Sequence, residues 1–383
     1  MKICALNPFF YPYHGGTEKV LFELYGRLAK RHDVCVISAG LPPNNKVERS
    51  EEINGIEVIR LRSDYINLPF LPIPMPVMRG LGDKIKSVNA DIYHINNRYL
   101  YYWGALNSIK TTRGRLTITL HNALPKGINP LIDTGGLLFD LLWGRKIMRD
   151  SKAVIGITKS VIETTVPKDL MWKTSIIFNG IDTNRFTRRG GRKVDKIREF
   201  IGGDEIILNV ARLTWQKGQV YLLRAFSKIA KERKGAVLLI IGSGHMKKWL
   251  LKEARRLGIM NKFRILSNVE EEALPYYYNA ADVFALPSLY EPASIAILEA
   301  LASKTPVVAS NIGGIPEMMK DAGRYSTPRD SESIASGIID ALEDKAESRR
   351  LAETGRRLML KEHDWDTIAN KYEALFRNCI SSR

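Results

Sequence analysis

Residues 287–314 read PSLYEPASIAILEALASKTPVVASNIGG and decide the fold. A run of apolar, β-prone residues at 282–286 comes directly before this stretch, and a second such run lies at 306–309. Between the two runs, residues 296–303 have the spacing of an amphipathic helix. Apolar strands joined by a helix predict a parallel sheet that is covered on both faces.

The same alternation of strand and helix extends to both sides of this stretch. In the second half of the chain we expect further helices at 219–231, 246–257 and 273–278, and strands at 206–211, 237–241 and 263–266. In the first half we expect helices at 17–31 and 99–109, and strands at 2–6, 33–38, 56–61, 91–95, 116–120, 153–157 and 175–178. The sequence therefore predicts an α/β protein with two Rossmann-like, doubly wound domains.

The chain length of 383 residues also suits two domains. A stretch rich in Arg, Gly and Lys at 184–196 is predicted to be the linker between them, which gives a first domain of residues 1–183. Ligands of doubly wound sheets bind at the carboxyl ends of the strands. We therefore expect the chemistry in a cleft where the two sheets face each other.

Cysteine usage and hydropathy point to a cytosolic protein. Cys4, Cys35 and Cys379 are far apart and odd in number, which argues against a disulfide framework and a cysteine-based metal cluster. The apolar start of the chain is interpreted as a strand, because no cleavage site of a signal peptide follows it. No run approaches the roughly 18 uninterrupted apolar residues of a spanning helix. Any membrane contact is expected to be peripheral.

The net charge of +17 is concentrated in the first half, where residues 1–190 hold 27 Lys and Arg against 16 Asp and Glu. A solvated basic surface accounts for this excess, and so does contact with an anionic ligand or membrane. The sequence does not decide between the two. Nucleic acid is not expected as a partner, because the basic residues are dispersed and no stacking-aromatic or zinc-binding motif accompanies them.

Two carboxylates, Glu291 and Glu299, lie eight positions apart in the opening stretch. If a helix begins near Ser294, they are up to about 12 Å apart, close to the distance between the sugar and the ribose of a nucleotide sugar. Backbone N–H groups at Ala293, Ser294 and Ile295, with the helix dipole, would favour a diphosphate between them without a metal. Alternatively, both glutamates are ordinary helix charges.

With this pattern of Glu, seven residues and Glu, the chain resembles glycosyltransferase family 4 over essentially its whole length. The resemblance implies the GT-B fold and a retaining hexosyltransferase that uses a nucleotide-diphosphate sugar and needs no cofactor or metal ion. It implies that Glu291 approaches the transferred sugar and that Glu299 binds the ribose hydroxyls. It also implies that a last helix, 364–383, packs back on the first domain, which limits the second domain to residues 184–363.

Two motifs of the first half fit the same resemblance. Gly15 and Gly16 follow the first strand, where glycines let the backbone approach the donor phosphates at a helix start. A plain turn capped by Thr17 is the alternative. His121 ends a strand where the resemblance implies an imidazole facing the donor sugar, and a buried structural histidine is the alternative. Asn122 stands where many relatives have Asp, so no base is predicted there.

Two motifs of the second half complete the predicted donor site. Arg212 and Lys217 match the family's phosphate clamp, in which cations neutralise the leaving nucleotide, a task that Mg²⁺ performs in other enzymes. Two surface bases near a helix start are the alternative. Gly242 and Val269 follow the next two strands, where the family binds the nucleobase largely through backbone groups. They do not distinguish UDP from GDP.

The acceptor is predicted only by class. Apolar segments at 68–78 and 127–143 in the basic first half suggest a lipid-linked or phospholipid sugar on an anionic membrane face, with ordinary packing as the alternative. Ala293 and Ser294 replace the Phe-Gly of many relatives and Lys304 replaces a usual Gly, so the transferred sugar is not predicted. The oligomeric state is not predicted either. Competing functions are a non-catalytic sugar-nucleotide-binding subunit of another transferase and a nucleotide-sugar epimerase.

Overall fold

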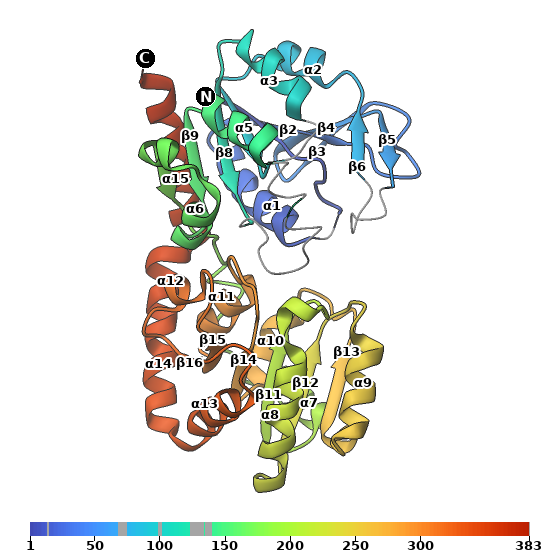
Figure 1. Cartoon of the computed structure of the whole chain (residues 1–383), viewed down its shortest axis with the longest axis vertical. Coiled ribbons are helices and arrows are strands. Elements are labelled where there is room, and N and C mark those ends of the chain that lie inside the picture. Colours follow the sequence, from blue (N-terminus) through green and yellow to red (C-terminus); the bar gives the residue numbers. More distant parts are fainter. Residues whose placement is uncertain (14, 68–74, 99–101, 123–133, 135–139, 383) are drawn as a thin grey trace. The chain divides into compact units, whose positions relative to one another are not determined.

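The computed structural model describes residues 1–13, 15–67, 75–98, 102–122, 134 and 140–382, and they form two compact units (Figure 1). The first unit comprises Met1–Asn179 and Trp365–Arg383, and the second comprises Gly180–Asp364. The first break thus falls after Asn179 rather than after residue 183. The last helix of the chain is part of the first unit.

The first unit is built on a sheet of eight described strands, of which seven are parallel. Its order is β10 (Thr174–Ile176), β9 (Ala153–Gly156), β8 (Arg115–Leu120), β7 (Ile92–Asn96), β1 (Lys2–Leu6), β2 (Asp33–Ala39), β4 (Ile56–Leu61) and β3 (Arg49–Ile53). Only the edge strand β3 is antiparallel. A separate hairpin consists of β5 (Ser63–Ile66) and β6 (Met75–Met78). The order reverses between β1 and β7, so the carboxyl ends of these two strands flank a ligand position typical of such sheets.

Helices connect these strands and cover the sheet. They are α1 (Gly16–Ala29), α2 (Leu81–Val88), α3 (Tyr102–Lys110), α5 (Arg145–Asp150) and α6 (Lys159–Thr165), with a π-helical turn η1 (Asp140–Gly144) and a 3-10 turn η2 (Lys168–Lys173). The terminal helix α15 (Trp365–Ser381) packs on α1. Arg27 pairs with Asp366 at 3.2 Å, and Arg31 pairs with Glu373 at 3.1 Å. The last helix therefore completes the first unit although it is distant in sequence.

The second unit has a fully parallel sheet with the strand order of a dinucleotide-binding fold. The order is β13 (Phe263–Leu266), β12 (Ala236–Ile241), β11 (Glu205–Val210), β14 (Val283–Leu286), β15 (Val307–Ser310) and β16 (Arg324–Ser326). Numbered within the unit, this is the doubly wound order 3-2-1-4-5-6. The winding reverses between β11 and β14. Ligands of such sheets bind at the carboxyl ends of the two strands that flank the reversal.

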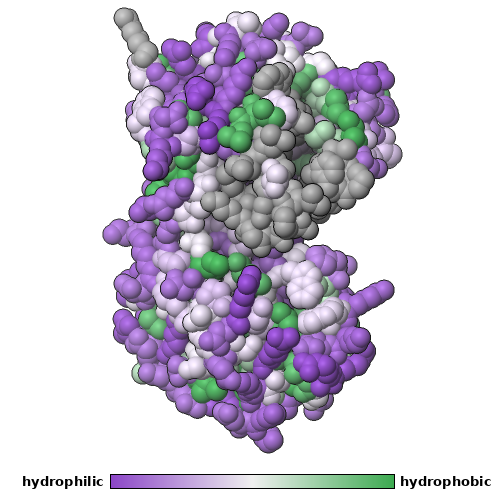
Figure 2. All heavy atoms as spheres, in the orientation of Figure 1, coloured by the Kyte–Doolittle hydropathy of each residue, from purple (hydrophilic) through white to green (hydrophobic). Residues whose placement is uncertain are grey.

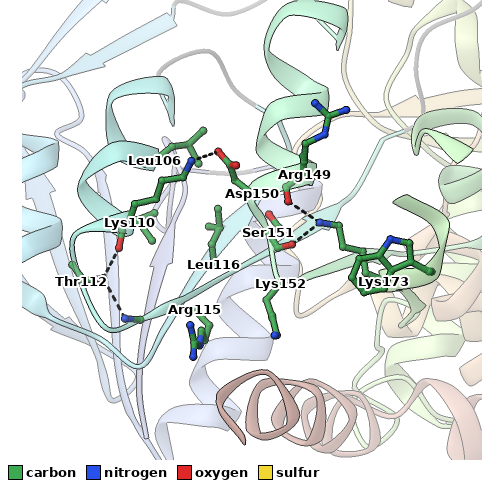
Figure 3. A pocket seen from close by; sticks show the side chains of 13 residues that line it. Leu106, Lys110, Thr112, Arg115, Leu116, Arg149, Asp150, Ser151, Lys152 and Lys173 are labelled. Carbon is green, nitrogen blue, oxygen red and sulfur yellow. Dashed lines mark hydrogen bonds and ion pairs between the residues drawn. The ribbon is translucent and has the colours of Figure 1, made fainter. Parts of the chain in front are cut away.

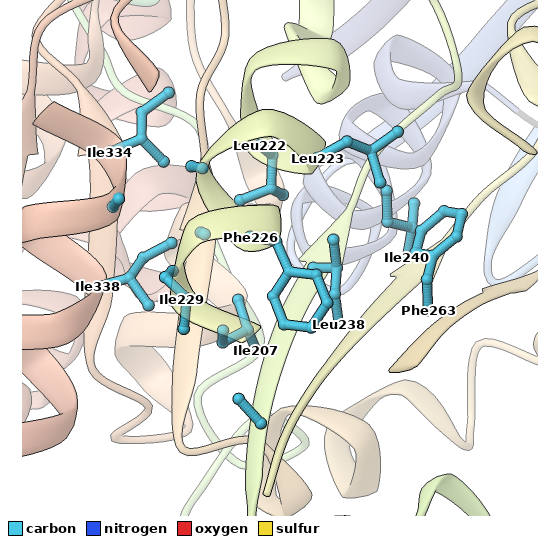
Figure 4. Packing of buried hydrophobic residues seen from close by; sticks show 14 of the residues in the cluster. Ile207, Leu222, Leu223, Phe226, Ile229, Leu238, Ile240, Phe263, Ile334 and Ile338 are labelled. Carbon is cyan, nitrogen blue, oxygen red and sulfur yellow. The ribbon is translucent and has the colours of Figure 1, made fainter. Parts of the chain in front are cut away.

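The core of the second unit lies between its sheet and the helices α8 and α13. The helices are α7 (Arg192–Ile201), α8 (Gln219–Glu232), α9 (Lys247–Arg256), α10 (Leu274–Ala280), α11 (Ile295–Ala302), α12 (Ile315–Met319), α13 (Ser331–Glu343) and α14 (Lys345–Leu358), with short turns η3 (Trp215–Lys217), η4 (Met260–Lys262) and η5 (Met359–His363). Figure 4 shows Phe226 and Ile229 of α8 pointing at Ile207 and Leu238 of the sheet, with Ile338 of α13 beside them. All five are fully buried.

The predicted linker at 184–196 is wrong in its last third, because α7 begins at Arg192. Basic residues dominate the composition of this stretch, but Val194 and Ile201 are buried on one face of the helix. Arg198 of the same helix donates to the carbonyl oxygen of Ala280 and pairs with Asp282 at 3.1 Å. Residues 192–196 therefore belong to a packed element of the second unit rather than to a linker.

Four strands, β3, β5, β6 and β16, were not expected from the sequence. β3 is charged and largely exposed, β5 and β6 form the separate hairpin, and β16 has only three residues. The edge strands β3 and β16 bury less than central strands and lack the apolar runs that reveal a strand. β6 (MPVM) is apolar, but its proline argues against a strand.

Hydrophilic side chains predominate on the face of the molecule shown in Figure 2, and the hydrophobic patches between them are small and scattered. Within the part of the chain that the structure describes, no helix is both long enough and apolar enough to cross a bilayer.

Candidate functional site

The loops that follow β11 and β14 touch each other at the reversal of the second sheet. Gly218 has a left-handed φ of 64°, and a Cβ atom there would lie 2.0 Å from the carbonyl oxygen of Pro287. The N–H of Leu289 donates to the carbonyl oxygen of Gln216 at 2.7 Å. Glycine is required at position 218 both by its backbone conformation and by this close approach.

Lys217 and Glu291 form an ion pair across these two loops. The Lys217 Nζ lies 2.6 Å from Glu291 Oε2, and the side chains are 17% and 4% exposed. The hydroxyl of Ser288 donates to the same carboxylate oxygen at 3.0 Å. The N–H of Gly314 holds the backbone of Glu291 by donating to its carbonyl oxygen at 3.0 Å. Two residues predicted to serve different ends of the donor are thus in direct contact.

Helix α11 begins next to this ion pair, as the sequence predicts. Ser294 is its N-cap and accepts a hydrogen bond from the N–H of Ile297 through its side chain. The first-turn amides of Ile295 and Ala296 have no carbonyl one turn earlier to bind. These amides, with the positive end of the helix dipole, make the start of α11 an anion-binding position. Ala293, directly before the cap, is half-buried.

Glu299 lies on the same helix and is almost fully buried. The hydroxyl of Tyr278 donates to its Oε2 at 2.8 Å, so the carboxylate is held by a side chain of α10. Burial beside this carboxylate raises the pKa of Tyr278. Arg212, in contrast, is exposed at the end of β11, and its carbonyl oxygen accepts from the Gln219 side chain at 3.0 Å.

The loops after β12 and β13 form the flank of the site. Gly242 has a φ of 155°, and a Cβ atom there would lie 2.0 Å from the carbonyl oxygen of Ala211. The hydroxyl of Ser267 donates to the carbonyl oxygen of Gly242 at 3.3 Å and accepts from Lys247 at 2.8 Å. Val269 is half-buried at the end of the second loop. The nucleobase role of these loops stays a prediction.

In the first unit, Gly15 is the N-cap of α1, and the helix begins at Gly16. Thr17 lies inside the helix, so the alternative in which it caps the helix is wrong. A Cβ atom on Gly15 would meet the Glu18 carboxylate at 2.1 Å. This carboxylate is buried, which raises its pKa. A phosphate that approaches Gly15 and Gly16 therefore has to displace or neutralise Glu18.

His121 follows β8 and is 6% exposed. Its backbone N–H donates to Asn97 Oδ1 at 2.8 Å, and its Nε2 lies 3.1 Å from Asn96 Oδ1. Burial lowers the pKa of His121 to about 4, so the ring is neutral near pH 7. A neutral imidazole can accept or donate one hydrogen bond on each nitrogen according to its tautomer.

The second unit brings together Glu291, Lys217 and the start of α11, and Glu299 lies further along the same helix. Gly15, Gly16 and His121 belong to the first unit, and their part in a shared donor site stays a prediction. Sequence reasoning missed the polar partners, which are Ser288, Tyr278, Ser267 and Asn96. For Asn96 a signal exists, because polar residues alternate with apolar ones in 93–96 (YHIN) and 116–121 (LTITLH).

A pocket of about 430 Å³ lies at the opposite, amino-terminal edge of the first sheet. Five cationic side chains and one carboxylate line it, namely Lys110, Arg115, Arg149, Lys152, Lys173 and Asp150. In Figure 3, Lys110 points to Asp150, while Arg115 and Lys152 extend together in another direction. Trp172, at the wall, is 80% exposed. The pocket thus combines positive charge with an exposed aromatic ring.

Comparisons with known proteins agree on one family. Residues 14–185 match the family Glycosyltransferase Family 4, and residues 192–358 match glycosyl transferases group 1. The chain is 31% identical over 366 residues to an uncharacterized glycosyltransferase of Methanocaldococcus jannaschii, with 90% of each protein covered. It is 32% identical over 389 residues to a glycogen synthase of Mycobacterium tuberculosis, with 93% of this chain and 89% of the relative covered.

The fold is also found in solved structures. A crystal structure of an Anabaena protein in complex with UDP and glucose has a TM-score of 0.78 at 20% identity, and the match covers 98% of this chain and 99% of that one. Such structural neighbours are GT-B proteins, so the predicted fold class is confirmed.

Proposed function

The chain belongs to glycosyltransferase family 4. We propose that it moves the sugar of a UDP-sugar or GDP-sugar donor to an acceptor with retention of the anomeric configuration. The observation that carries this proposal is the Lys217–Glu291 ion pair beside the start of α11. It puts a cation, a carboxylate and unpaired helix amides at the reversal of a doubly wound sheet, where a nucleotide diphosphate belongs.

The leaving diphosphate is held by fixed charges of the protein in this proposal. The Lys217 ammonium has three N–H donors, and one bond to Glu291 leaves two for phosphate oxygens. Arg212, exposed at the end of β11, adds a guanidinium. The amides at the start of α11 supply further donors. Preorganised donors of this kind stabilise the charge that develops on the leaving group, so the reaction proceeds without a metal ion.

The sugar is held by carboxylates and by His121. Glu291 receives both described hydrogen bonds on Oε2, which leaves Oε1 for a sugar hydroxyl. Glu299 accepts from the ribose hydroxyls, and His121 binds a hydroxyl of the sugar. The bond from the anomeric carbon to the phosphate oxygen breaks while the acceptor oxygen bonds to the same face. The acceptor proton passes to the leaving phosphate, so no separate base is needed.

A lipid-linked or phospholipid sugar is the proposed acceptor, on the anionic face of a membrane. Residues 68–74, 127–133 and 135–139 of the predicted apolar segments lie outside the described residues. Within the described remainder, Leu141 and Leu142 are 48% and 50% exposed. The cationic pocket with its exposed Trp172 offers a second contact. Cations beside exposed apolar side chains favour binding to anionic bilayers.

Donor binding is tested by thermal unfolding with a panel of nucleotide diphosphates and their sugars, since a ligand of the native state raises Tm. We expect Tm to rise with one UDP or GDP compound, and we expect Lys217→Gln to abolish this rise. Transfer is tested by NMR of the product, in which the anomeric configuration of the donor should be kept. Binding without turnover on any acceptor would favour the non-catalytic subunit, and inversion would contradict the proposed stereochemistry. Unchanged rates in EDTA are expected.

Membrane contact is tested by flotation with neutral vesicles and with vesicles that contain phosphatidylglycerol. We expect binding only to the anionic vesicles, and weaker binding for Trp172→Ala. Tyr325→Ala, at an exposed aromatic residue of the second unit, is the matched control. Absence of flotation at physiological salt contradicts the membrane proposal without affecting the donor site.

A further inference from the structure

Six buried side chains of the first unit form one continuous chain of hydrogen bonds that begins at His121. In order they are His121, Asn96, Tyr25, His94, Thr119 and Tyr372. The successive distances are 3.1 Å, 2.9 Å, 2.9 Å, 2.9 Å and 3.1 Å. The chain ends on α15, so it joins the last helix of the protein to a predicted active-site residue.

The two-residue period of β-strands brings these side chains together. His94 and Asn96 lie two positions apart on β7, and Thr119 and His121 lie two positions apart at the end of β8, so all four face the same side of the sheet. Helices α1 and α15 contribute Tyr25 and Tyr372. The His94 ring also packs edge-on against the Tyr25 ring, with 6.0 Å between centroids. The rings are therefore fixed by packing as well as by hydrogen bonds.

The amide of Asn96 sets the direction of the chain, because its nitrogen only donates and its oxygen only accepts. Asn96 Oδ1 faces His121 Nε2, so this nitrogen carries the proton. Asn96 Nδ2 donates to the Tyr25 oxygen, whose own proton then goes to His94 Nδ1. Otherwise a buried hydroxyl would be left without an acceptor, which is costly.

The same donor and acceptor rule decides which ring nitrogen of His94 carries the proton. With Nδ1 accepting, the neutral His94 ring carries its proton on Nε2 and donates to the Thr119 oxygen. Burial holds the pKa of His94 near 3 and that of His121 near 4, so both rings are neutral around pH 7. A neutral ring with its proton on Nε2 has a lone pair on Nδ1.

We propose that this hydrogen-bond chain fixes the proton of His121 on Nε2 and thereby makes Nδ1 an acceptor for a hydroxyl of the donor sugar. The inference rests on the proposed function of His121 at the sugar. Asn96, Tyr25, His94, Thr119 and Tyr372 are positioning residues that act through His121. Reversal of the Asn96 amide would reverse each bond between His121 and Thr119 and turn His121 Nδ1 into a donor.

The tautomer is measured directly by NMR of protein labelled with ¹⁵N-histidine, without donor, at pH 7. The chain has only six histidines, and the two signals are assigned with His94→Gln and His121→Gln. The expected result is a proton on Nε2 of both rings. A proton on Nδ1 of His121 overturns the inference. This measurement does not depend on turnover, so it separates failure of the inference from failure of the proposed function.

Tyr25→Phe removes the hydroxyl in the middle of the chain. We expect the His121 signals to shift or to show both tautomers, and kcat/KM to fall about 10-fold, roughly the effect of one lost hydrogen bond. Tyr93→Phe is the matched control, because the Tyr93 hydroxyl is equally buried but donates to the carbonyl oxygen of Ile85. Unchanged His121 signals in Tyr25→Phe would show that the chain does not set the tautomer.

Thr119 offers a rescue test at the other side of His94. Thr119→Val keeps the shape and removes the hydroxyl, whereas Thr119→Ser keeps the hydroxyl. We expect the tautomer signature and activity to be disturbed in the first variant and restored in the second. Equal behaviour of the two variants would mean that Thr119 acts by packing alone and is not part of the positioning chain.

Discussion

The Lys217 Nζ lies 2.6 Å from Glu291 Oε2 and joins the loops after β11 and β14. Both side chains are largely withdrawn from water, and removal of one partner from a buried pair leaves an uncompensated charge that costs about 3–5 kcal/mol. The pair therefore fixes the geometry of two loops, and in the proposed function it holds two charges where the donor binds. The contribution of the pair to stability and its contribution to activity can be measured separately.

Glu291→Gln is expected to lower kcat/KM about 100-fold or more, because the carboxylate no longer orients Lys217 or binds the sugar. It should also lower the free energy of unfolding, measured in urea. Glu347→Gln is the control, since it removes the partner of Arg350 in an exposed pair of the same unit with an equal distance of 2.6 Å. That variant should match the parent in both measurements. Parental activity of Glu291→Gln would refute its catalytic role.

Gly218→Ala is expected to separate the two loops, because its Cβ would lie 2.0 Å from the Pro287 oxygen. Gly258→Ala provides the control, with a similar φ of 70° and nothing within 4 Å of its Cβ. The control should lose about 1 kcal/mol of stability from backbone strain alone. Gly218→Ala should lose clearly more and should also lose activity. Equal losses would show that the loops tolerate the clash.

Ser294→Ala removes the side-chain cap of α11 and should cost about 1 kcal/mol in the free energy of unfolding. It should also raise KM for the donor, because the first-turn amides are then less well fixed. Asp330→Ala removes an equivalent cap from α13, where Asp330 accepts from the N–H groups of Glu332 and Ser333. A rise in KM in both variants would point to general destabilisation rather than to the donor site.

The order of the central strands and helices, and the start of α11 shortly after β14, could be predicted from the sequence. Apolar runs marked β9, β11, β12, β14 and β15, because burial on both faces requires hydrophobic side chains. In β7 and β8 polar residues alternate with apolar ones, and the polar side chains form buried hydrogen bonds. The contact between Lys217 and Glu291 could not be foreseen, since 74 positions separate them and only the reversal of strand order brings their loops together. Ser288 and Tyr278 lie only 3 and 21 positions from the carboxylates that they contact, but nothing in the sequence shows which hydroxyl faces which carboxylate.

At Lys304 the sequence singles out a position, and the structure shows the backbone conformation there. The resemblance implies Gly at this position, and the φ of Lys304 is 58°. The N–H groups of Thr305 and Lys304 bind the carbonyl oxygens of Ala300 and Leu301, which is the pattern that ends a helix with a left-handed residue. A residue other than glycine therefore carries backbone strain at this position, and the Lys304 ammonium pairs with Glu353 at 2.7 Å.

Because His94 and His121 are buried, we expect the protein to lose stability in acid. Burial lowers the pKa of His121 to about 4 and that of His94 to about 3, whereas a histidine in the unfolded chain titrates near 6.5. Between these values the unfolded chain binds more protons than the folded one, so acid favours unfolding. Stability is complete above about pH 6.5 and falls by about 1.4 kcal/mol per pH unit for each histidine as the pH drops toward the folded pKa.

The measurement is the free energy of unfolding in urea at pH 7.5 and at pH 5.5. His94→Gln should reduce the difference between the two values by about 1.4 kcal/mol relative to the parent, whatever it does to stability at either pH. His245→Gln, at an exposed histidine, is the control and should leave the difference as in the parent. If His94→Gln keeps the full difference, then His94 is not a neutral, buried ring, and the hydrogen bonds from Tyr25 and to Thr119 lose their assigned direction.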